Sequence, residues 1–288
     1  MQVAETIAQC RRAVAEARAS GKVVGFVPTM GALHEGHYQL IDAARRECGF
    51  VVVSIFVNPT QFAPGEDLSR YPRTPQADLA GCERRGADLV FLPGPAEMYP
   101  RGRTEVEVTP GRLAETLCGR SRPGHFAGVC TVVAKLLNIV QPQKAYFGAK
   151  DFQQAVIVAR MVEDLDFPVE VVRCPTVREA DGLAMSSRNR YLSPAERAQA
   201  AALSRALAAA EEIIRSGPRA SADVVAAVRE RLAAEAPDGQ IDYVQVVDPR
   251  TLEDVEVARP AVLVALAVRF GGARLIDNVL VDGPAAGG

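Results

Sequence analysis

The order of apolar and polar residues predicts alternating strands and helices in the first part of this chain. Three apolar runs are typical of strands, at residues 23–27, 50–57 and 88–92. Around them, apolar residues recur at helical spacing over residues 3–19, 34–48 and 75–86. The run at 50–57 is almost unbroken, as in strands buried on both faces of a parallel sheet. The pattern therefore predicts an α/β fold with a doubly wound parallel sheet.

The alternation continues less regularly up to about residue 176. Pro and Gly turns interrupt the stretch that follows residue 92, where we expect a strand at 105–109 and a loop at 119–125. Helices are then predicted at 129–140 and 152–163, and strands at 145–147 and 169–172. These elements extend the same sheet, so we expect one domain over residues 1–176.

The chain changes character past residue 176. Ser193, Pro194 and Glu196 form a predicted capping box with a proline start, which opens a long alanine-rich helix that ends at Gly217. A second helix is predicted at 221–234. Apolar segments follow near residues 241–248, 261–269 and 273–281. Helices followed by an antiparallel meander indicate a smaller C-terminal α+β domain over residues 177–288.

Composition excludes several classes of protein. The chain has 288 residues and a formal net charge of −2, which argues against a nucleic-acid-binding surface. Six widely spaced cysteines without a CxxC pair indicate reduced, buried thiols of a cytosolic protein. The N-terminal residues lack the apolar core of a signal peptide, and no apolar run approaches membrane-spanning length. We expect a cytoplasmic protein that binds neither nucleic acid nor membrane.

Two of the three histidines, His34 and His37, follow the first predicted strand directly. Their spacing puts both rings on one face of a helix, whose N-terminus offers backbone N–H groups to a phosphate. Gly31 and Gly36 let a nucleotide approach the backbone closely. The fingerprint GxGxxG is missing here, so a nicotinamide dehydrogenase is not expected. We interpret the stretch as a nucleotide phosphate site; the alternative is a pair of surface histidines without a ligand.

These residues resemble a known family. A strand followed by HxGH is the hallmark of the nucleotidyltransferase superfamily that includes class I aminoacyl-tRNA synthetases. The fuller string FVPTMGALHEGH is similar to the pantothenate synthetases (pantoate–β-alanine ligases, AMP-forming). Further similar motifs are VNPTQF, YPRTP, RPGHFAGV, FGAKDFQQ and MSSR, which extend the resemblance over residues 23–192. It implies a Rossmann-like, ATP- and pantoate-binding catalytic domain of the HxGH nucleotidyltransferase type, with the second domain as a lid over the site.

The resemblance implies an ATP site made from three stretches of the chain. These are Met30, Gly31, Ala32, Leu33, His34, Glu35, Gly36 and His37; Gly148, Ala149, Lys150 and Asp151; and Val177, Met185, Ser186, Ser187 and Arg188. Catalysis would rest on His37, His34, Lys150 and Arg188, with His37 as the best candidate for a proton-donating role. Taken without the resemblance, Lys150 can be a solvated lysine at a helix start and the last stretch a charged interdomain linker.

Pantoate and β-alanine would be held by amide and basic side chains. The residues implied are Gln61, Gln154, Asn58, Arg122 and His125. Taken alone, Asn58 before Pro59 is more typical of a turn, and His125 is equally typical of a plain loop histidine.

Asp78 is the candidate metal ligand. The family often carries two adjacent acids linked to Mg²⁺ at this point, whereas here Ala77 precedes Asp78. We expect the phosphates of the co-substrate ATP to provide most of the Mg²⁺ coordination, and no tightly bound organic cofactor. The alternative is a solvated acid that favours the positive end of a helix.

The resemblance implies a two-step condensation of pantoate with β-alanine. Pantoate would attack ATP to give pantoyl adenylate and pyrophosphate, and β-alanine would then displace AMP to form pantothenate. The substrates would be ATP, pantoate and β-alanine, and the protein a homodimer. The alternatives are another nucleotidylyltransferase of the HxGH type, which would not need Gln61 and Gln154, and a nucleotide-binding module without catalysis.

Overall fold

The computed structural model describes residues 1–102 and 104–283 and divides into two compact units. Unit 1 comprises Met1–Gly111, Arg122–Ala149 and Ile157–Pro175. Unit 2 comprises the other segments of the chain, which are Arg112–Ser121, Lys150–Val156 and the residues from Thr176 onwards. A single division near residue 176 therefore does not account for two short segments that belong to unit 2.

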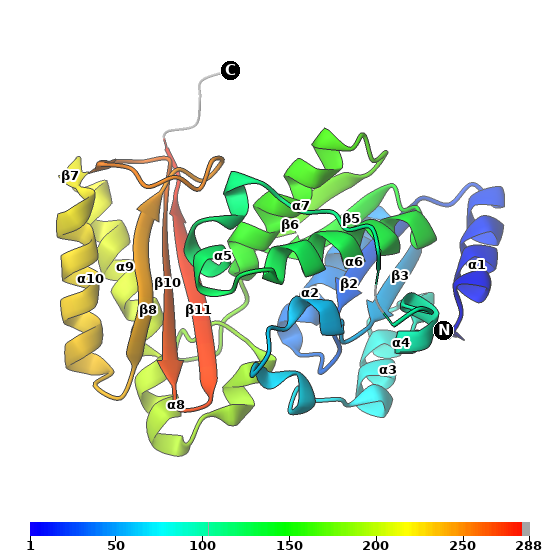
Figure 1. The fold of residues 1–288 in the computed structure, drawn as a ribbon, viewed down its shortest axis with the longest axis horizontal. Helices are drawn as coiled ribbons and strands as arrows, with labels where there is room; N and C mark the ends of the chain where they lie inside the picture. Colours follow the sequence, from blue (N-terminus) through cyan, green and yellow to red (C-terminus); the bar gives the residue numbers. More distant parts are fainter. Residues whose placement is uncertain (103, 284–288) are drawn as a thin grey trace. The chain divides into compact units, whose positions relative to one another are not determined.

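Unit 1 is built on a six-stranded parallel sheet, which confirms the predicted α/β class (Figure 1). Its strands, in spatial order, are β1 (Gln2–Ala4), β4 (Leu89–Phe91), β3 (Phe50–Ile55), β2 (Val24–Thr29), β5 (Lys144–Gly148) and β6 (Glu170–Cys174). The chain moves outward from β2 to β3 and β4, then returns to place β5 on the other side of β2. This reversal between β2 and β5 is a topological switch point, where open α/β sheets bind ligands at the carboxyl ends of their strands.

Helices cover the sheet of unit 1. They are α1 (Ile7–Ala19), α2 (Glu35–Glu47), α3 (Pro75–Arg84), the short α4 (Pro95–Met98), α6 (His125–Val140) and most of α7 (Phe152–Asp164). Ile41 of α2 is fully buried against Val51 and Val53 of β3. Phe50 and Val52, which point to the opposite face of that strand, are equally buried. The unbroken apolar run thus reflects a strand covered on both faces, as predicted.

Unit 2 is built on an antiparallel sheet of β8 (Gln240–Val247), β10 (Val262–Phe270) and β11 (Ala273–Val281). The helices α8 (Pro194–Ala200), α9 (Ala202–Arg215) and α10 (Ser221–Glu235) belong to it, and α9 packs on β11 while α10 packs on β8 (Figure 1). A second apolar cluster joins the sheet residue Leu263 to Leu117 of α5 (Leu117–Ser121) and to Phe152. Short strands β7 (Arg219–Ala220) and β9 (Val257–Ala258) form a separate pair. The predicted meander is confirmed.

Two predictions of secondary structure are wrong. Residues 2–4 form strand β1, and α1 begins only at Ile7 because Thr6 caps it in a capping box with Gln9. Residues 105–109 pair with no strand of the described chain; Val106 is 84% exposed there. The alternation of polar and apolar residues in that segment therefore does not correspond to a half-buried strand.

Several predicted boundaries shift. The helix expected from Ser193 to Gly217 is two helices, α8 and α9, which meet at Ala201. The loop expected at 119–125 contains the end of α5 and the start of α6. Short 3-10 turns lie at Pro59–Gln61, Asp67–Ser69, Arg112–Ala114, Ala149–Asp151 and Ser187–Tyr191.

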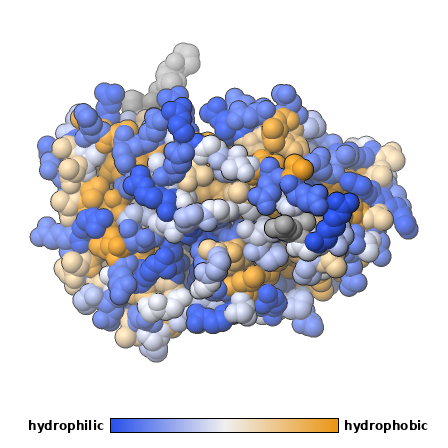
Figure 2. Space-filling model, viewed as in Figure 1, coloured by the Kyte–Doolittle hydropathy of each residue, from blue (hydrophilic) through white to orange (hydrophobic). Residues whose placement is uncertain are grey.

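All six cysteines are buried and unpaired, as the spacing predicts. Burial raises the pKa of the Cys10, Cys82 and Cys130 thiols to about 12, so these thiols stay protonated at neutral pH. Among the described residues, no helix combines the length and the apolar character that a membrane crossing requires. The face drawn in Figure 2 intermingles hydrophilic and hydrophobic residues.

The start of α8 gives a stability prediction. The Ser193 hydroxyl accepts a hydrogen bond from the Glu196 N–H, and the Glu196 carboxylate accepts one from the Ser193 N–H, which confirms the predicted capping box. We expect Ser193→Ala to lower the free energy of unfolding by about 1 kcal/mol, the usual loss for such a cap. Chemical denaturation followed by circular dichroism measures it. Ser193→Thr keeps the acceptor oxygen and should lie close to wild type; equal losses in both variants would contradict the capping role.

Candidate active site

The turn after β2 positions the two histidines. Gly31 and Ala32 both adopt left-handed backbone conformations, with φ of 80° and 50°. Glycine adopts this conformation freely, whereas for alanine it costs roughly 1 kcal/mol or more, so other contacts must hold the turn. Thr29 contributes one of them: its hydroxyl donates to the Ser54 carbonyl at 2.7 Å and accepts from the Gly31 N–H at 3.2 Å. The turn delivers His34 to the N-cap position of α2.

Backbone hydrogen bonds orient both imidazoles. His34 Nδ1 accepts from the Gly36 N–H at 3.2 Å, and His37 Nδ1 accepts from the His34 N–H at 3.3 Å. Each neutral ring therefore carries its proton on Nε2. The ring centroids lie 4.1 Å apart, so the sequence spacing does bring the two rings together. The result is a pair of N–H donors at a helix N-terminus, beside the carboxyl end of β2.

Asp78 holds this turn from α3. Its Oδ2 accepts from the Ala32 N–H at 2.9 Å and its Oδ1 from the Leu33 N–H at 2.8 Å. Oδ1 also accepts from the Thr74 hydroxyl at 3.0 Å, and the residue is only 2% exposed. The alternative of a solvated helix acid is therefore wrong. Both oxygens are committed to the protein, and the described residues contain no group of three or more acidic, His or Cys side chains that could hold a metal. This environment does not fit a magnesium ligand.

The Glu35 side chain is paired with Arg85, the residue that follows α3. Both of its carboxylate oxygens accept from Arg85, at 2.9 and 2.7 Å, and Arg85 also donates to Asp42 at 2.7 Å. Since both carboxylate oxygens are bonded to Arg85, the predicted ATP contact of Glu35 would be made by its backbone.

Gln61 follows β3, at the neighbouring strand end, and its amide is oriented by Asn58. The Asn58 Nδ2 donates to Gln61 Oε1 at 3.2 Å, while the Tyr99 hydroxyl donates to Asn58 Oδ1 at 2.7 Å. Gln61 Nε2 lies 3.0 Å from the Met30 sulfur. Asn58 is 1% exposed and donates to Gly128 as well. The Asn58 side chain is therefore buried, and its amide orients Gln61.

Arg122 and His125 hold the backbone of the same turn. Arg122 donates to the Gln61 carbonyl at 3.3 Å and forms two short hydrogen bonds with the Glu66 carboxylate. His125 Nδ1 lies 2.7 Å from the Gln61 carbonyl oxygen and its Nε2 lies 3.0 Å from Arg122. A carbonyl only accepts and a guanidinium only donates, so His125 is neutral with its proton on Nδ1. The structure thus brings Gln61, Asn58, Arg122 and His125 together.

The remaining predicted residues are divided between the two units. Gly148 ends β5 and Ala149 begins the following 3-10 turn in unit 1, whereas Lys150, Asp151 and Gln154 belong to unit 2. Asn278 of β11 donates to the Lys150 carbonyl at 2.9 Å, and the Lys150 ammonium lies 3.8 Å from the Asp151 carboxylate. Gln154 is half-buried, whereas its neighbour Gln153 is buried and donates to the carbonyls of Leu113 and Thr116.

The stretch from Val177 to Arg188 is a braced hairpin in unit 2. Met185 N–H donates to the Val177 carbonyl at 2.9 Å, and Ser186 Oγ accepts from the Arg188 N–H at 3.2 Å. At its turn, Arg197 pairs with Glu179 at 2.6 Å. The charges that suggest a linker are largely internal ion pairs of this unit, and Ser187 is buried.

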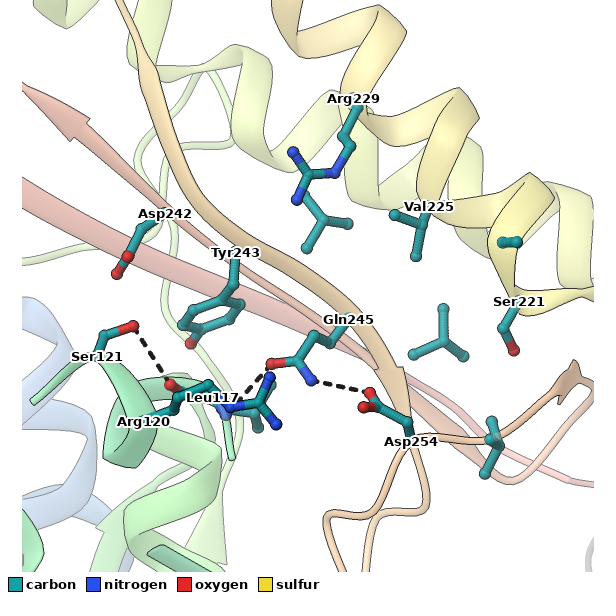
Figure 3. Close-up of a pocket in the computed structure, with 14 residues that line it drawn as sticks. Leu117, Arg120, Ser121, Ser221, Val225, Arg229, Asp242, Tyr243, Gln245 and Asp254 are labelled. Carbon is teal, nitrogen blue, oxygen red and sulfur yellow. Dashed lines mark hydrogen bonds between the residues drawn. The ribbon is translucent and has the colours of Figure 1, made fainter. Parts of the chain in front are cut away.

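Unit 2 also contains a cavity of about 470 Å³ between α5, α10 and β8 (Figure 3). None of the predicted site residues lines it. Its central amide, Gln245, accepts from the Leu117 N–H and donates to Asp254, so this group is already satisfied within the protein.

Comparison with known proteins identifies the family. The family model described as pantoate-beta-alanine ligase matches residues 2–280. This chain belongs to the pantoate–β-alanine ligase family. A pantothenate synthetase from Acetivibrio thermocellus is 51% identical over 283 residues, 98% of this chain and 100% of that protein.

Solved structures of the pantoate–β-alanine ligase family share this fold. The pantothenate synthetase of Thermus thermophilus superposes with a TM-score of 0.92 at 50% identity, covering 98% of this chain and 100% of that one. A pantoate-beta-alanine ligase from Francisella tularensis, complexed with beta-gamma ATP and beta-alanine, gives 0.79 at 33% identity with 99% of each chain covered.

Sequence reasoning missed the residues that support the ligase motifs from a distance. Tyr99 and Glu66 orient the Gln61 turn, and Asn278 anchors the Lys150 backbone. None of these residues lies in a motif, and no spacing connects them to their partners. Only the opposite charges of Glu66 and Arg122 offered a signal. Oppositely charged residues are too common along the chain for charge alone to show which two are in contact.

The Glu66–Arg122 pair gives a pH-dependent prediction. Burial opposes ionisation of Glu66, but its hydrogen bonds with Arg122 and the charge of that side chain outweigh burial, so its pKa lies below the ordinary value of 4.5. The unfolded carboxylate therefore binds protons more readily than the folded one. The stabilisation is present at neutral pH and is lost as the pH falls through the folded pKa.

We expect Glu66→Gln to lower the melting temperature at pH 7, and the difference from wild type to shrink below pH 4.5. Glu105→Gln is the matched control, because Glu105 is 76% exposed and its Arg101 partner lies 3.9 Å away. Calorimetry at both pH values measures the effect, and a difference that grows on acidification would contradict the assignment.

Proposed function

We propose that this chain condenses pantoate with β-alanine to pantothenate, consuming ATP and releasing AMP and pyrophosphate through a pantoyl-adenylate intermediate. Family membership supports this function. The observation that carries the chemistry is the orientation of His34 and His37, whose Nδ1 atoms accept backbone N–H groups, so that in the neutral rings the protons lie on Nε2. We assign these Nε2–H groups to the phosphate oxygens of ATP.

The first step is an attack on phosphorus. A carboxylate oxygen of pantoate bonds to the α-phosphorus of ATP, and the bond from that phosphorus to the pyrophosphate oxygen breaks with its electron pair. Negative charge grows on the phosphate oxygens, where His34, His37 and the N-terminus of α2 stabilise it. His37 is the proposed donor to these oxygens: because its Nδ1 accepts the His34 N–H, its Nε2–H donates a hydrogen bond and the ring keeps its proton.

The family resemblance assigns further donors to the triphosphate. These are Lys150, Ser186, Ser187 and Arg188, with residues 185–188 as the loop that covers it. The adenosine and phosphate contacts come from the other predicted ATP residues: Met30, Gly31, Ala32, Leu33, Glu35, Gly36, Gly148, Ala149, Asp151, Val177 and Met185. Mg²⁺ arrives with the ATP phosphates, which are its usual ligands in such enzymes.

The second step is acyl transfer to an amine. The nitrogen of β-alanine attacks the acyl carbon of pantoyl adenylate, and the carbon–oxygen bond to AMP breaks with its electron pair passing to the AMP phosphate oxygen. The nitrogen releases its proton to water. Gln61 and Gln154 hold the acid substrates through amide groups. No enzyme thiol is needed as a nucleophile, in keeping with the protonated state of Cys10, Cys82 and Cys130.

We also infer a homodimer that works in the cytoplasm, on the strength of the family resemblance. Light scattering tests the assembly: a homodimer has twice the chain mass of 30.8 kDa, and a mass of one chain would contradict it.

The phosphate side is tested by pyrophosphate exchange into ATP. We expect exchange that depends on pantoate, followed by pantothenate formation when β-alanine is added. His37→Ala and Lys150→Ala should each slow turnover about 100-fold or more, the scale of losing one transition-state donor. Lys22→Ala is the control, because Lys22 is exposed at the amino end of β2.

Each outcome discriminates. Exchange without pantoate would indicate another nucleotidylyltransferase, and no exchange would indicate a binding module. Near-normal turnover in either variant would remove that residue from the mechanism.

The acid side is tested at Gly128, where α6 touches the Gln61 turn. A Cβ at Gly128 would lie 2.4 Å from the Thr60 carbonyl oxygen and 2.7 Å from the Gln61 nitrogen, so Gly128→Ala must displace that turn. We expect kcat/KM for pantoate to fall roughly tenfold or more, because small displacements of positioning groups are costly. Gly111→Ala is the control, since a Cβ there meets no atom within 4 Å. Unchanged kinetics with pantoate in Gly128→Ala would argue against Gln61 as its ligand.

A further inference from the structure

We propose that Asp78 is a positioning residue that fixes the left-handed turn carrying His34 and His37, and that it is not a magnesium ligand. The inference rests on the proposed function for its catalytic consequence. Its structural content, the binding of two backbone amides by one carboxylate, stands on the geometry of unit 1 alone.

The turn presents two consecutive N–H groups to one anion. Gly31 and Ala32 both have positive φ, an arrangement that directs neighbouring amides into the same concavity. The Asp78 carboxylate fills that concavity: Oδ2 receives the Ala32 N–H and Oδ1 the Leu33 N–H, at 2.9 and 2.8 Å. An added Cβ on Gly31 would lie 3.0 Å from Oδ2, so the carboxylate packs directly against the turn.

Thr74 also holds the Asp78 side chain in place. Thr74 donates to Oδ1 at 3.0 Å, and the Asp78 N–H donates to the Thr74 carbonyl at 2.9 Å. The carboxylate is buried, and its surroundings include the Tyr38 and Cys82 side chains, both of which are neutral at physiological pH. Two N–H donors and one hydroxyl therefore solvate the charge.

A magnesium ion needs a different environment. It demands near-octahedral oxygen coordination and retains several waters. Asp78 is 2% exposed, residue 77 is alanine, and the described part of the chain offers no cluster of additional acidic, His or Cys ligands. In this chain the acid that the family resemblance links to the metal instead binds two backbone N–H groups of the turn.

The catalytic consequence follows from sequence adjacency. Leu33 is buried in the apolar cluster below α2, and the next residue is His34 at the N-cap. A shift of the Ala32 and Leu33 amides is passed directly to the His34 backbone, whose N–H orients the His37 ring. Asp78 thus acts through the two imidazoles without touching substrate.

Asp78→Asn tests the positioning role, because it keeps the volume and leaves one oxygen for two amides. We expect kcat to fall about 10- to 100-fold, the scale of a misplaced catalytic group. The Mg²⁺ concentration for half-maximal rate and the KM for β-alanine should stay within about twofold of wild type. The amide NMR signals of Ala32 and Leu33 should move and exchange faster with solvent.

Asp88→Asn is the matched control. Asp88 is a carboxylate that accepts from the Val51 N–H at 2.7 Å and from Arg45 at 2.6 Å, at the amino end of β4. It should lower stability without changing kcat or the Ala32 and Leu33 signals. A loss in Asp78→Asn that added Mg²⁺ restores, or wild-type kcat with unmoved signals, would overturn the proposal.

The wild-type chain tests the metal half of the proposal without mutation. Mn²⁺ added alone should not selectively broaden the Ala32 and Leu33 amide signals, and selective broadening would mark Asp78 as a metal ligand. If Asp78→Asn does not fold, Thr74→Val serves instead. We expect a several-fold loss of kcat and moved amide signals, with the Mg²⁺ dependence unchanged, and wild-type values would contradict the proposal. Absence of pantoate-dependent exchange in the wild type would overturn the proposed function only, since the NMR measurements do not depend on it.

Discussion

Parallel pairing of β2, β3 and β5 is the constraint on which the candidate site of unit 1 depends. Parallel strands place all their carboxyl ends at one edge of the sheet. The histidine turn follows β2, the Gln61 turn follows β3, and Gly148 ends β5. Groups that lie far apart in the chain therefore share one edge without any long-range signal in the sequence. The contact between Gln61 and Met30 joins the first two of these turns.

A second layer of buried polar groups decides which atom each of these side chains presents. Asn58 accepts from Tyr99 and donates to Gln61, which fixes the direction of the Gln61 amide. Asp78 does the same for a backbone turn, and Glu66 for Arg122. Asn58 and Asp78 are buried, and Glu66 is half-buried. An unsatisfied hydrogen-bonding group costs free energy in such surroundings, so these side chains favour one arrangement. Contacts within the folded chain thus fix the orientation of these side chains.

The sequence was sufficient for the parts that depend on local pattern and motif. The buried run of β3, the capping box at Ser193 and the family motifs around His34 and His37 all follow from neighbouring residues. The three-residue strand β1 was missed because it is too short to show periodicity, and 105–109 was overpredicted because alternation alone does not supply a partner strand. The role of Asp78 was beyond reach because its two amide partners lie 45 and 46 residues away.

The composition of unit 2 from three stretches of chain has a consequence for the order of synthesis. Leu117 of α5 and Phe152 are synthesised more than 100 residues before their apolar partners Leu263 and Ala265. Until β10 is complete, those side chains have no finished core to enter, and the nascent chain must carry them exposed or loosely covered. A ribosome releasing this chain before residue 270 would therefore leave apolar surface open on segments made more than 100 residues earlier. The folding of unit 2 is in this sense completed only after β10 has been synthesised.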